Sequence, residues 1–351
     1  MDCNFREPSL EARKLGYKVG IGAGKKETLV KYLEENEHIG ILNDYARKGR
    51  IEYEIEEEEA EIETEGMSEE EILARSEKAA QEVKYELFLY LTRRLTEMNK
   101  SIGLKFDVMC AEIRILLVLE RDSEAKVALQ KTEHLMELGV DWGRKNKFKV
   151  YKGLLSMLEK DYRKAAELFL DALSTFEGEE LLTYRELVHY SIFCGLLTLS
   201  RAEIGQKLME SSEVREVIGE IDGAGELVES FYECNYFQMF SYLVEFSESL
   251  LEDVNLRGTV DYFVYMMKVR AYNQLFTSYR AISLAQMSSI FRVRREYILR
   301  DIERMILRED LQCKISHSNM MVYNTPAETK DTLREQAEEL SHTIQKIISS
   351  K

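Results

Sequence analysis

The sequence predicts a mainly α-helical protein in which stacked pairs of helices precede a small domain of helices and a β-hairpin, followed by one last helix. Three observations support this fold class. Prolines occur only at Pro8 and Pro326, so no proline ring interrupts a helix between them. Apolar residues recur at helical spacing over most of the chain. Residues 325–351 carry a heptad pattern.

Composition indicates a protein with ordinary cores and free thiols. The chain has 351 residues, a length that can hold about two or three domains. Its hydrophobic content of 45% is enough for ordinary cores, and its formal net charge is −16. The first residues lack the apolar core of a secretory signal, and no uncharged apolar run is long enough to span a membrane. We therefore expect no membrane contact and a location in cytosol and nucleus. The cysteines are odd in number and never form a Cys-x-x-Cys pair, which argues against disulfides and zinc: Cys3, Cys110, Cys194, Cys234 and Cys313.

Residues 1–78 form an N-terminal segment with little helical pattern. The glycine cluster in Gly16–Thr28 lacks the spacing of a phosphate loop or a dinucleotide fold, so we interpret it as a flexible turn. Glutamate dominates residues 52–71, which predicts a solvated helix face or a disordered acidic segment. Ser68 and Glu71 are spaced as a capping box that starts the next helix.

Residues 79–255 are predicted to be helical repeats. An apolar stripe at Phe148–Leu158 is followed by a second at Tyr162–Leu173, with only Lys160 and Asp161 between them. So short a connection requires an antiparallel helix pair. Small Ala165 and Ala166 alternate with bulky side chains, as in tetratricopeptide-like repeats. Such pairs bury their faces by stacking, which favours a solenoid.

Residues 256–324 are predicted to contain a winged helix. A helix over 260–277 leads into a short helix, a turn, and a longer helix whose apolar face we assign to Tyr297, Ile298, Ile302, Met305 and Ile306. LQCKI (Leu311–Ile315) and MMVY (Met320–Tyr323) then form a two-stranded wing, which needs further support to be stable. The edge of the wing can accept a neighbouring strand. We take Leu311, Cys313 and Ile315 as candidate partner-binding residues.

Residues 325–351 are predicted to form the C-terminal helix. Thr325 and Pro326 suit its start, and apolar residues then alternate at spacings of four and three. The helix either folds back on its own chain or enters a bundle with helices of other subunits, and the narrow seam favours the bundle. The candidate contact residues are Leu333, Leu340, Ile344 and Ile347.

Sequence motifs indicate neither catalysis nor a bound cofactor. The histidines form no zinc-binding pattern, and no nucleophile elbow occurs. Winged helices often read DNA, but the acidic chain and the acids Asp301 and Glu303 on the second helix favour a protein partner. Binding to duplex DNA that is lost on neutralising Arg294, Arg295 and Arg304 would support the alternative.

Three segments carry a resemblance to a known family: Asp141–Phe176, Ser230–Phe240 and Arg270–Phe291. They resemble the PCI-domain subunits of the proteasome lid, and LQCKI and the terminal helix continue the likeness. The family joins helical repeats to a winged helix and also occurs in the COP9 signalosome and a translation initiation factor. The resemblance implies a non-catalytic scaffold in a hetero-oligomer. Its partners would be other lid subunits, with the ATPase ring and core particle beyond them, and the signalosome is the alternative complex.

Two departures from the family pattern stand out. The N-terminal part is shorter and more acidic than the family leads us to expect. Arg292 and Arg294 stand where the family tends to have glycine in the turn between the two winged-domain helices. A residue other than glycine in a left-handed turn costs roughly 1 kcal/mol. We therefore expect this turn to adopt a different geometry.

Overall fold

The computed structural model describes residues 26–48, 50–51, 67–176 and 180–324. The chain divides into two compact units: residues 1–221 with 251–257, and residues 222–250 with 258–351. Within the described residues, no helix is both long and apolar enough to cross a membrane. Three of the cysteines, Cys110, Cys194 and Cys313, are buried free thiols, and Cys234 is a half-buried one, whereas Cys3 lies outside the described residues.

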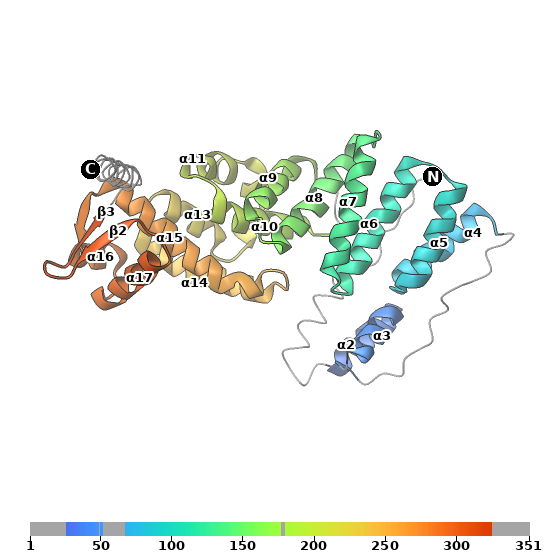
Figure 1. Ribbon diagram of the computed structural model, residues 1–351, viewed down its shortest axis with the longest axis horizontal. Helices are drawn as coiled ribbons and strands as arrows, with labels where there is room; N and C mark the ends of the chain where they lie inside the picture. Colours follow the sequence, from blue (N-terminus) through green and yellow to red (C-terminus); the bar gives the residue numbers. More distant parts are fainter. Residues whose placement is uncertain (1–25, 49, 52–66, 177–179, 325–351) are drawn as a thin grey trace, which may run out of the picture. The chain divides into compact units, whose positions relative to one another are not determined.

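The first unit is a succession of helices, most of which pack on their neighbours in chain order (Figure 1). Its elements are α2 (Lys26–Glu35), α3 (Ile39–Arg47), α4 (Glu69–Gln81), α5 (Tyr85–Met98), α6 (Ile102–Val118), α7 (Asp122–Glu137), α8 (Trp142–Leu158), α9 (Tyr162–Ala172), η1 (Leu173–Thr175), α10 (Tyr184–Thr198), α11 (Arg201–Ile204), a π-helical turn η2 (Gly205–Met209), α12 (Ser212–Val217) and η3 (Ile218–Glu220). The helices α2 and α3 lie in the segment where the sequence pattern indicated no helix.

Local signals start and end these helices where the sequence predicted. Ser68 accepts a hydrogen bond from the backbone of Glu71, and the Glu71 carboxylate accepts one from the backbone of Ser68, so the predicted capping box is confirmed. The predicted boundary at residue 78 falls inside α4. Between α8 and α9, Lys160 takes a left-handed conformation, which reverses the chain within the short connection.

The pair α8 and α9 packs closely because a glycine faces an aromatic ring. An added Cβ at Gly153 would lie 2.6 Å from Cε1 of Phe169, which is fully buried. Ala165 and Ala166 are also buried on α9, the helix that carries Phe169. The predicted antiparallel pair and its small-to-large packing are therefore present.

A polar network lies inside the repeats. Arg114 on α6 is only 1% exposed and donates a hydrogen bond to the hydroxyl of Tyr151 on α8. Tyr151 in turn donates to Glu180 at 3.2 Å, and Lys147 forms a 2.7 Å ion pair with the same carboxylate. Burying the Arg114 charge is tolerable because these oxygens solvate it. The network fixes α6, α8 and the segment before α10 to one another.

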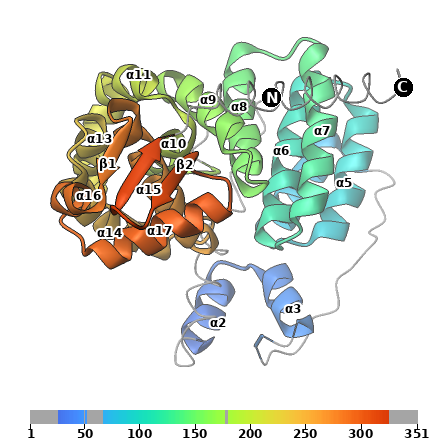
Figure 2. The ribbon, with the colours of Figure 1, turned by 60° about the vertical axis from the view of Figure 1, so that its left-hand side comes forward.

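The second unit holds the predicted winged helix and one strand more than the sequence indicated. Its elements are α13 (Ala224–Tyr232), α14 (Tyr236–Glu252), η4 (Arg257–Thr259), α15 (Val260–Ser278), β1 (Ala281–Ser283), α16 (Leu284–Phe291), α17 (Arg295–Leu307), β2 (Cys313–Ser316) and β3 (Met321–Asn324). The sheet has the order β1-β3-β2 and both pairings are antiparallel, with Ile282 opposite Val322 and Ile315 opposite Val322 (Figure 2). The additional strand β1 supplies the support that the two-stranded wing needed.

We predict that Gly153→Val destabilises the repeats. The new side chain must displace the buried Phe169 ring, so the free energy of unfolding should fall by roughly 2–3 kcal/mol. Urea unfolding of the full chain, followed by circular dichroism, measures the change. Gly219→Val is the control because nothing lies within 4 Å of an added Cβ there. Equal unfolding midpoints for the two variants would contradict the packing described.

Candidate functional site

The winged-helix part of the second unit is held by an aromatic cluster around Phe291, the last residue of α16. Its ring is buried and lies 5.0 Å from Tyr236, 5.2 Å from Phe240 and 5.0 Å from Tyr272, measured between ring centroids. The partners come from α14 and α15, so one side chain ties three helices together. Stacked and edge-on aromatic pairs each contribute about 0.5–1.5 kcal/mol beyond burial.

The turn after Phe291 has a left-handed backbone conformation, which glycine adopts with less strain than the arginine found there. Arg292 has φ 52° and ψ 38°, so the expectation of a different turn geometry was wrong. The guanidinium of Arg292 lies 4.3 Å over the ring of Phe237, a cation–π contact worth about 0.5–1 kcal/mol. This contact offsets much of the strain that a side chain brings to the left-handed region. Arg294 is extended and forms the N-cap position of α17.

An ion pair joins α15 to α17 beneath the surface. Nζ of Lys268 lies 2.8 Å from Oδ2 of Asp301, and it also donates a hydrogen bond to the hydroxyl of Tyr297. Burial lowers the pKa of Lys268, but the bonds to Asp301 and Tyr297 outweigh it and the net shift is upward. Both members of the pair are largely buried.

These contacts correct two expectations for α17. Asp301 is 8% exposed and is turned toward α15, so it does not lie where a phosphate would approach. Tyr297, assigned to the apolar face, is 43% exposed, whereas Ile298, Ile302 and Met305 are buried as predicted.

The sheet presents one buried and one outer face. Ile282 and Val322 lie on the inner face, while Lys314 and Tyr323 alternate to the outside. Asn324 fixes the end of β3 to α15, because its Nδ2 donates to the carbonyl of Phe276 at 2.8 Å. Among the strands that the structure describes, β3 is central, and β2 lies at an edge of the sheet with β3 on one side.

The candidate residues on the wing are placed mostly inside the domain. Leu311 is 3% exposed and Cys313 6% exposed, and only Ile315 is half-buried. Burial raises the pKa of the Cys313 thiol to about 11, as expected for an unreactive side chain. A partner at this edge would therefore pair with the backbone of β2, with the outward Lys314 beside it. Leu333, Leu340, Ile344 and Ile347 lie outside the described residues.

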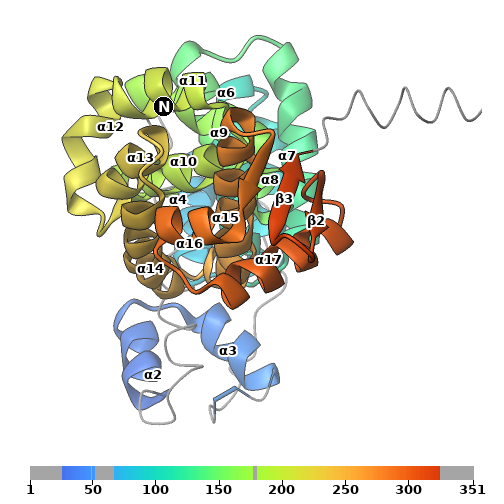
Figure 3. The same ribbon diagram turned by 90° about the vertical axis from the view of Figure 1, so that its left-hand side faces the viewer.

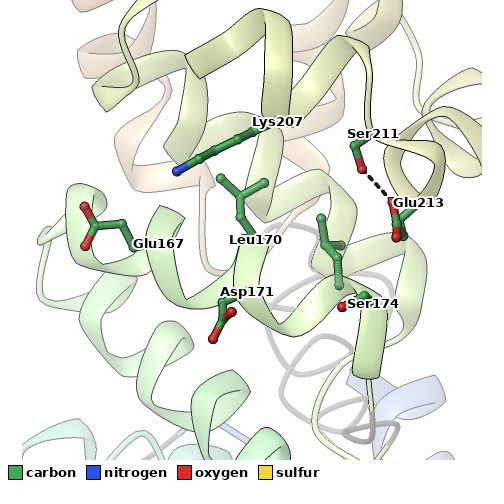
Figure 4. Close-up of a pocket in the computed structure, with 8 residues that line it drawn as sticks. Glu167, Leu170, Asp171, Ser174, Lys207, Ser211 and Glu213 are labelled. Atoms are coloured by element: carbon green, nitrogen blue, oxygen red, sulfur yellow. Dashed lines mark hydrogen bonds between the residues drawn. The ribbon is translucent and has the colours of Figure 1, made fainter. Parts of the chain in front are cut away.

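Two hollows lie in the first unit. One, of about 480 Å³, is lined by α9, η2 and the segment after it (Figure 4). Its carboxylates are already engaged: Glu167 with Arg163, Asp171 with Lys149, and Glu213 with the hydroxyl of Ser211. The other, of about 430 Å³, lies among α5, α6 and α7 and contains Glu112, whose pKa is raised by burial.

Nothing in the described ranges resembles a metal centre, since no group of three or more potential ligands from His, Cys, Asp and Glu comes together there. In the second unit, the strand β2 lies at an edge of the sheet, and α17 follows α16 in the winged helix (Figure 3).

Comparisons with known proteins identify two family models and several relatives. A family model described as 26S proteasome subunit RPN7 matches residues 46–207, and the PCI domain model matches residues 240–325. The chain is 30% identical over 260 residues to "26S proteasome non-ATPase regulatory subunit 6" of Dictyostelium discoideum, covering 73% of this chain and 68% of that protein. It is 34% identical over 233 residues to "26S proteasome regulatory subunit rpn7" of Schizosaccharomyces pombe, covering 65% of this chain and 59% of the relative.

A more distant similarity exists to another complex. The chain is 24% identical over 187 residues to "COP9 signalosome complex subunit 1" of Arabidopsis thaliana, covering 53% of this chain and 42% of that protein.

The ion pair between α15 and α17 yields a test of how the winged helix is positioned. Lys268→Met leaves the Asp301 carboxylate buried without its cation, so the free energy of unfolding should fall by about 3 kcal/mol. Thermal unfolding of the full chain measures the loss. The double variant Lys268→Met with Asp301→Leu should recover most of it, because no charge is left buried. A double variant no more stable than Lys268→Met alone would contradict this role.

Proposed function

The chain belongs to the family of the 26S proteasome subunit RPN7, and from this membership we propose that it is a non-catalytic structural subunit of the regulatory-particle lid. The resemblance to PCI-domain lid subunits, and within them to non-ATPase subunit seven, is confirmed by the family models and relatives. Its role in this proposal is to support lid assembly and thereby ubiquitin-dependent protein degradation.

One observation carries the proposal: the RPN7 and PCI family models match different parts of the same chain and coincide with its two kinds of architecture. The first match spans helix pairs from α4 to α10, and the second contains the winged helix. The relative's description as a non-ATPase regulatory subunit supports a role without ATP hydrolysis. Because the chain spans 55% to 68% of these proteasome relatives, their assembly is transferred here as a proposal.

We infer that the partners are other lid subunits in a hetero-oligomer, with the ATPase ring and the core particle beyond them. In this proposal the backbone edge of β2, which pairs with β3 on its other side, accepts a strand of a neighbouring chain. The heptad residues Leu333, Leu340, Ile344 and Ile347 supply the second contact, a helix bundle. Cytosol and nucleus remain the expected compartments.

The COP9 signalosome is the alternative complex. The relatives favour the proteasome, because the identity to its subunits is 30–34% in the two alignments given, against 24% for the signalosome subunit over a shorter stretch. A tagged full-length chain, purified gently from its native cell, decides between them by mass spectrometry. Lid, ATPase and core subunits are expected. Recovery of signalosome subunits, or of the chain alone, would overturn the proposal.

The terminal helix gives a sharper test of assembly. We predict that Leu340→Asp with Ile344→Asp leaves the chain folded but reduces its incorporation into the lid by about tenfold or more, because charge enters an apolar bundle seam. Native gel electrophoresis of the tagged chain measures incorporation. The control, His342→Asp with Gln345→Asp, introduces the same residues away from the seam. Normal incorporation of the seam variant would sink the bundle hypothesis.

A further inference from the structure

The outer side of α17 carries a row of exposed side chains, here called the arginine row: Tyr297, Arg300, Arg304 and Leu307. Their spacings of three, four and three residues place them along one side of the helix. Tyr297 is 43% exposed, Leu307 is 85% exposed, and both arginines are exposed. Over these residues the row extends for about 15 Å, or nearly three helical turns.

The two arginines of the row differ from three neighbouring cations of the second unit. Lys268 is paired with Asp301, Arg292 lies over Phe237, and Arg308 lies 4.9 Å over the ring of Tyr265. By contrast, neither Arg300 nor Arg304 has a carboxylate within salt-bridge distance among the residues that the structure describes. On a chain with a net charge of −16, these two guanidinium groups lie one turn apart and leave two positive charges exposed on α17. They are available for an external anion.

The packing beneath the row makes it a rigid surface. Ile298, Ile302 and Met305 anchor the opposite side of α17 in the core, and Asp301 ties it to α15 through Lys268. The same lysine lies 4.8 Å from the centroid of the Tyr297 ring and donates to its hydroxyl, which holds that ring in place. Because the helix and the Tyr297 ring are already held, a ligand orders only the remaining side chains of the row, which lowers the entropic cost of binding.

We propose that the arginine row docks an acidic amphipathic helix of a neighbouring protein subunit, through residues other than those of β2. The proposal rests on the proposed function as an assembly subunit. Carboxylates four residues apart on a partner helix match Arg300 and Arg304, and arginine binds carboxylates through two parallel hydrogen bonds. Tyr and Arg are also the residues enriched at protein interfaces.

Leu307 favours protein over nucleic acid as the occupant. Leu307 is 85% exposed and can bury apolar surface against an apolar side chain of a partner helix. A phosphate backbone offers no such apolar contact. Glu296 is exposed, and half-buried Glu303 lies 3.8 Å from His317, so two carboxylates accompany the arginines on α17. Phosphates would be repelled by these groups, whereas a helix with spaced carboxylates and an apolar stripe can avoid them.

Photo-crosslinking in the native assembly tests the proposal. The full-length chain with p-benzoylphenylalanine at Leu307 is purified with whatever complex it forms, irradiated, and its adducts are sequenced by mass spectrometry. We expect an adduct with an acidic, helical segment of another subunit. Arg300→Glu with Arg304→Glu should lower the yield by about tenfold or more, and matching carboxylate-to-lysine changes in the partner segment should restore it.

The control uses the same helix. Arg294→Glu with Arg295→Glu changes the charge equally but lies at the start of α17, away from the row, and should leave the adduct unchanged. A nucleic-acid adduct, an adduct insensitive to charge reversal in the row, or none at all would overturn the proposal. Co-purification of proteasome subunits is a second, independent measurement. If those subunits are recovered without the adduct, the docking proposal fails and the proposed function stands.

Discussion

The packing of aromatic rings from α14 and α15 around Phe291 of α16 is the interaction on which the second unit depends. Its ring touches Tyr236 and Phe240 of α14 and Tyr272 of α15, so α16 cannot shift without breaking contacts with both helices. The left-handed turn at Arg292 follows directly and sets the direction in which α17 begins. The winged helix is therefore a platform whose outer side of α17 and edge strand β2 are held in fixed positions.

Much of the fold could be predicted because its signals are local. Apolar periodicity and the two-residue connection at Lys160 predicted α8 and α9, and Ser68 with Glu71 predicted the start of α4. The strand β1 was missed because three residues directly before a helix carry no periodicity of their own. It exists through its partner β3, with Ile282 opposite Val322.

The candidate site was harder to predict because orientation depends on tertiary contacts. Tyr297 fits the apolar spacing of α17 as well as the row on the outer side, and only the burial of Asp301 against Lys268 decides which side faces inward. An acid that looked like an obstacle to an anionic ligand is in fact a structural partner of a lysine. The apolar side chains of Leu311 and Cys313 are buried in the core of the domain. The edge of β2 consists of backbone N–H and C=O groups, which have no sequence signature.

The strand order bears on how this protein is made. Of the strands that the structure describes, β3 is the last to be synthesised and also the central one, since Ala281 and Lys314 both pair with Tyr323. Until the ribosome has delivered β3, β1 and β2 have no neighbour, whereas the helix pairs of the first unit complete their contacts within short stretches of chain. The apolar inner face of the wing is consequently among the last surfaces to be covered, which makes this interval the one in which a chaperone has most to protect.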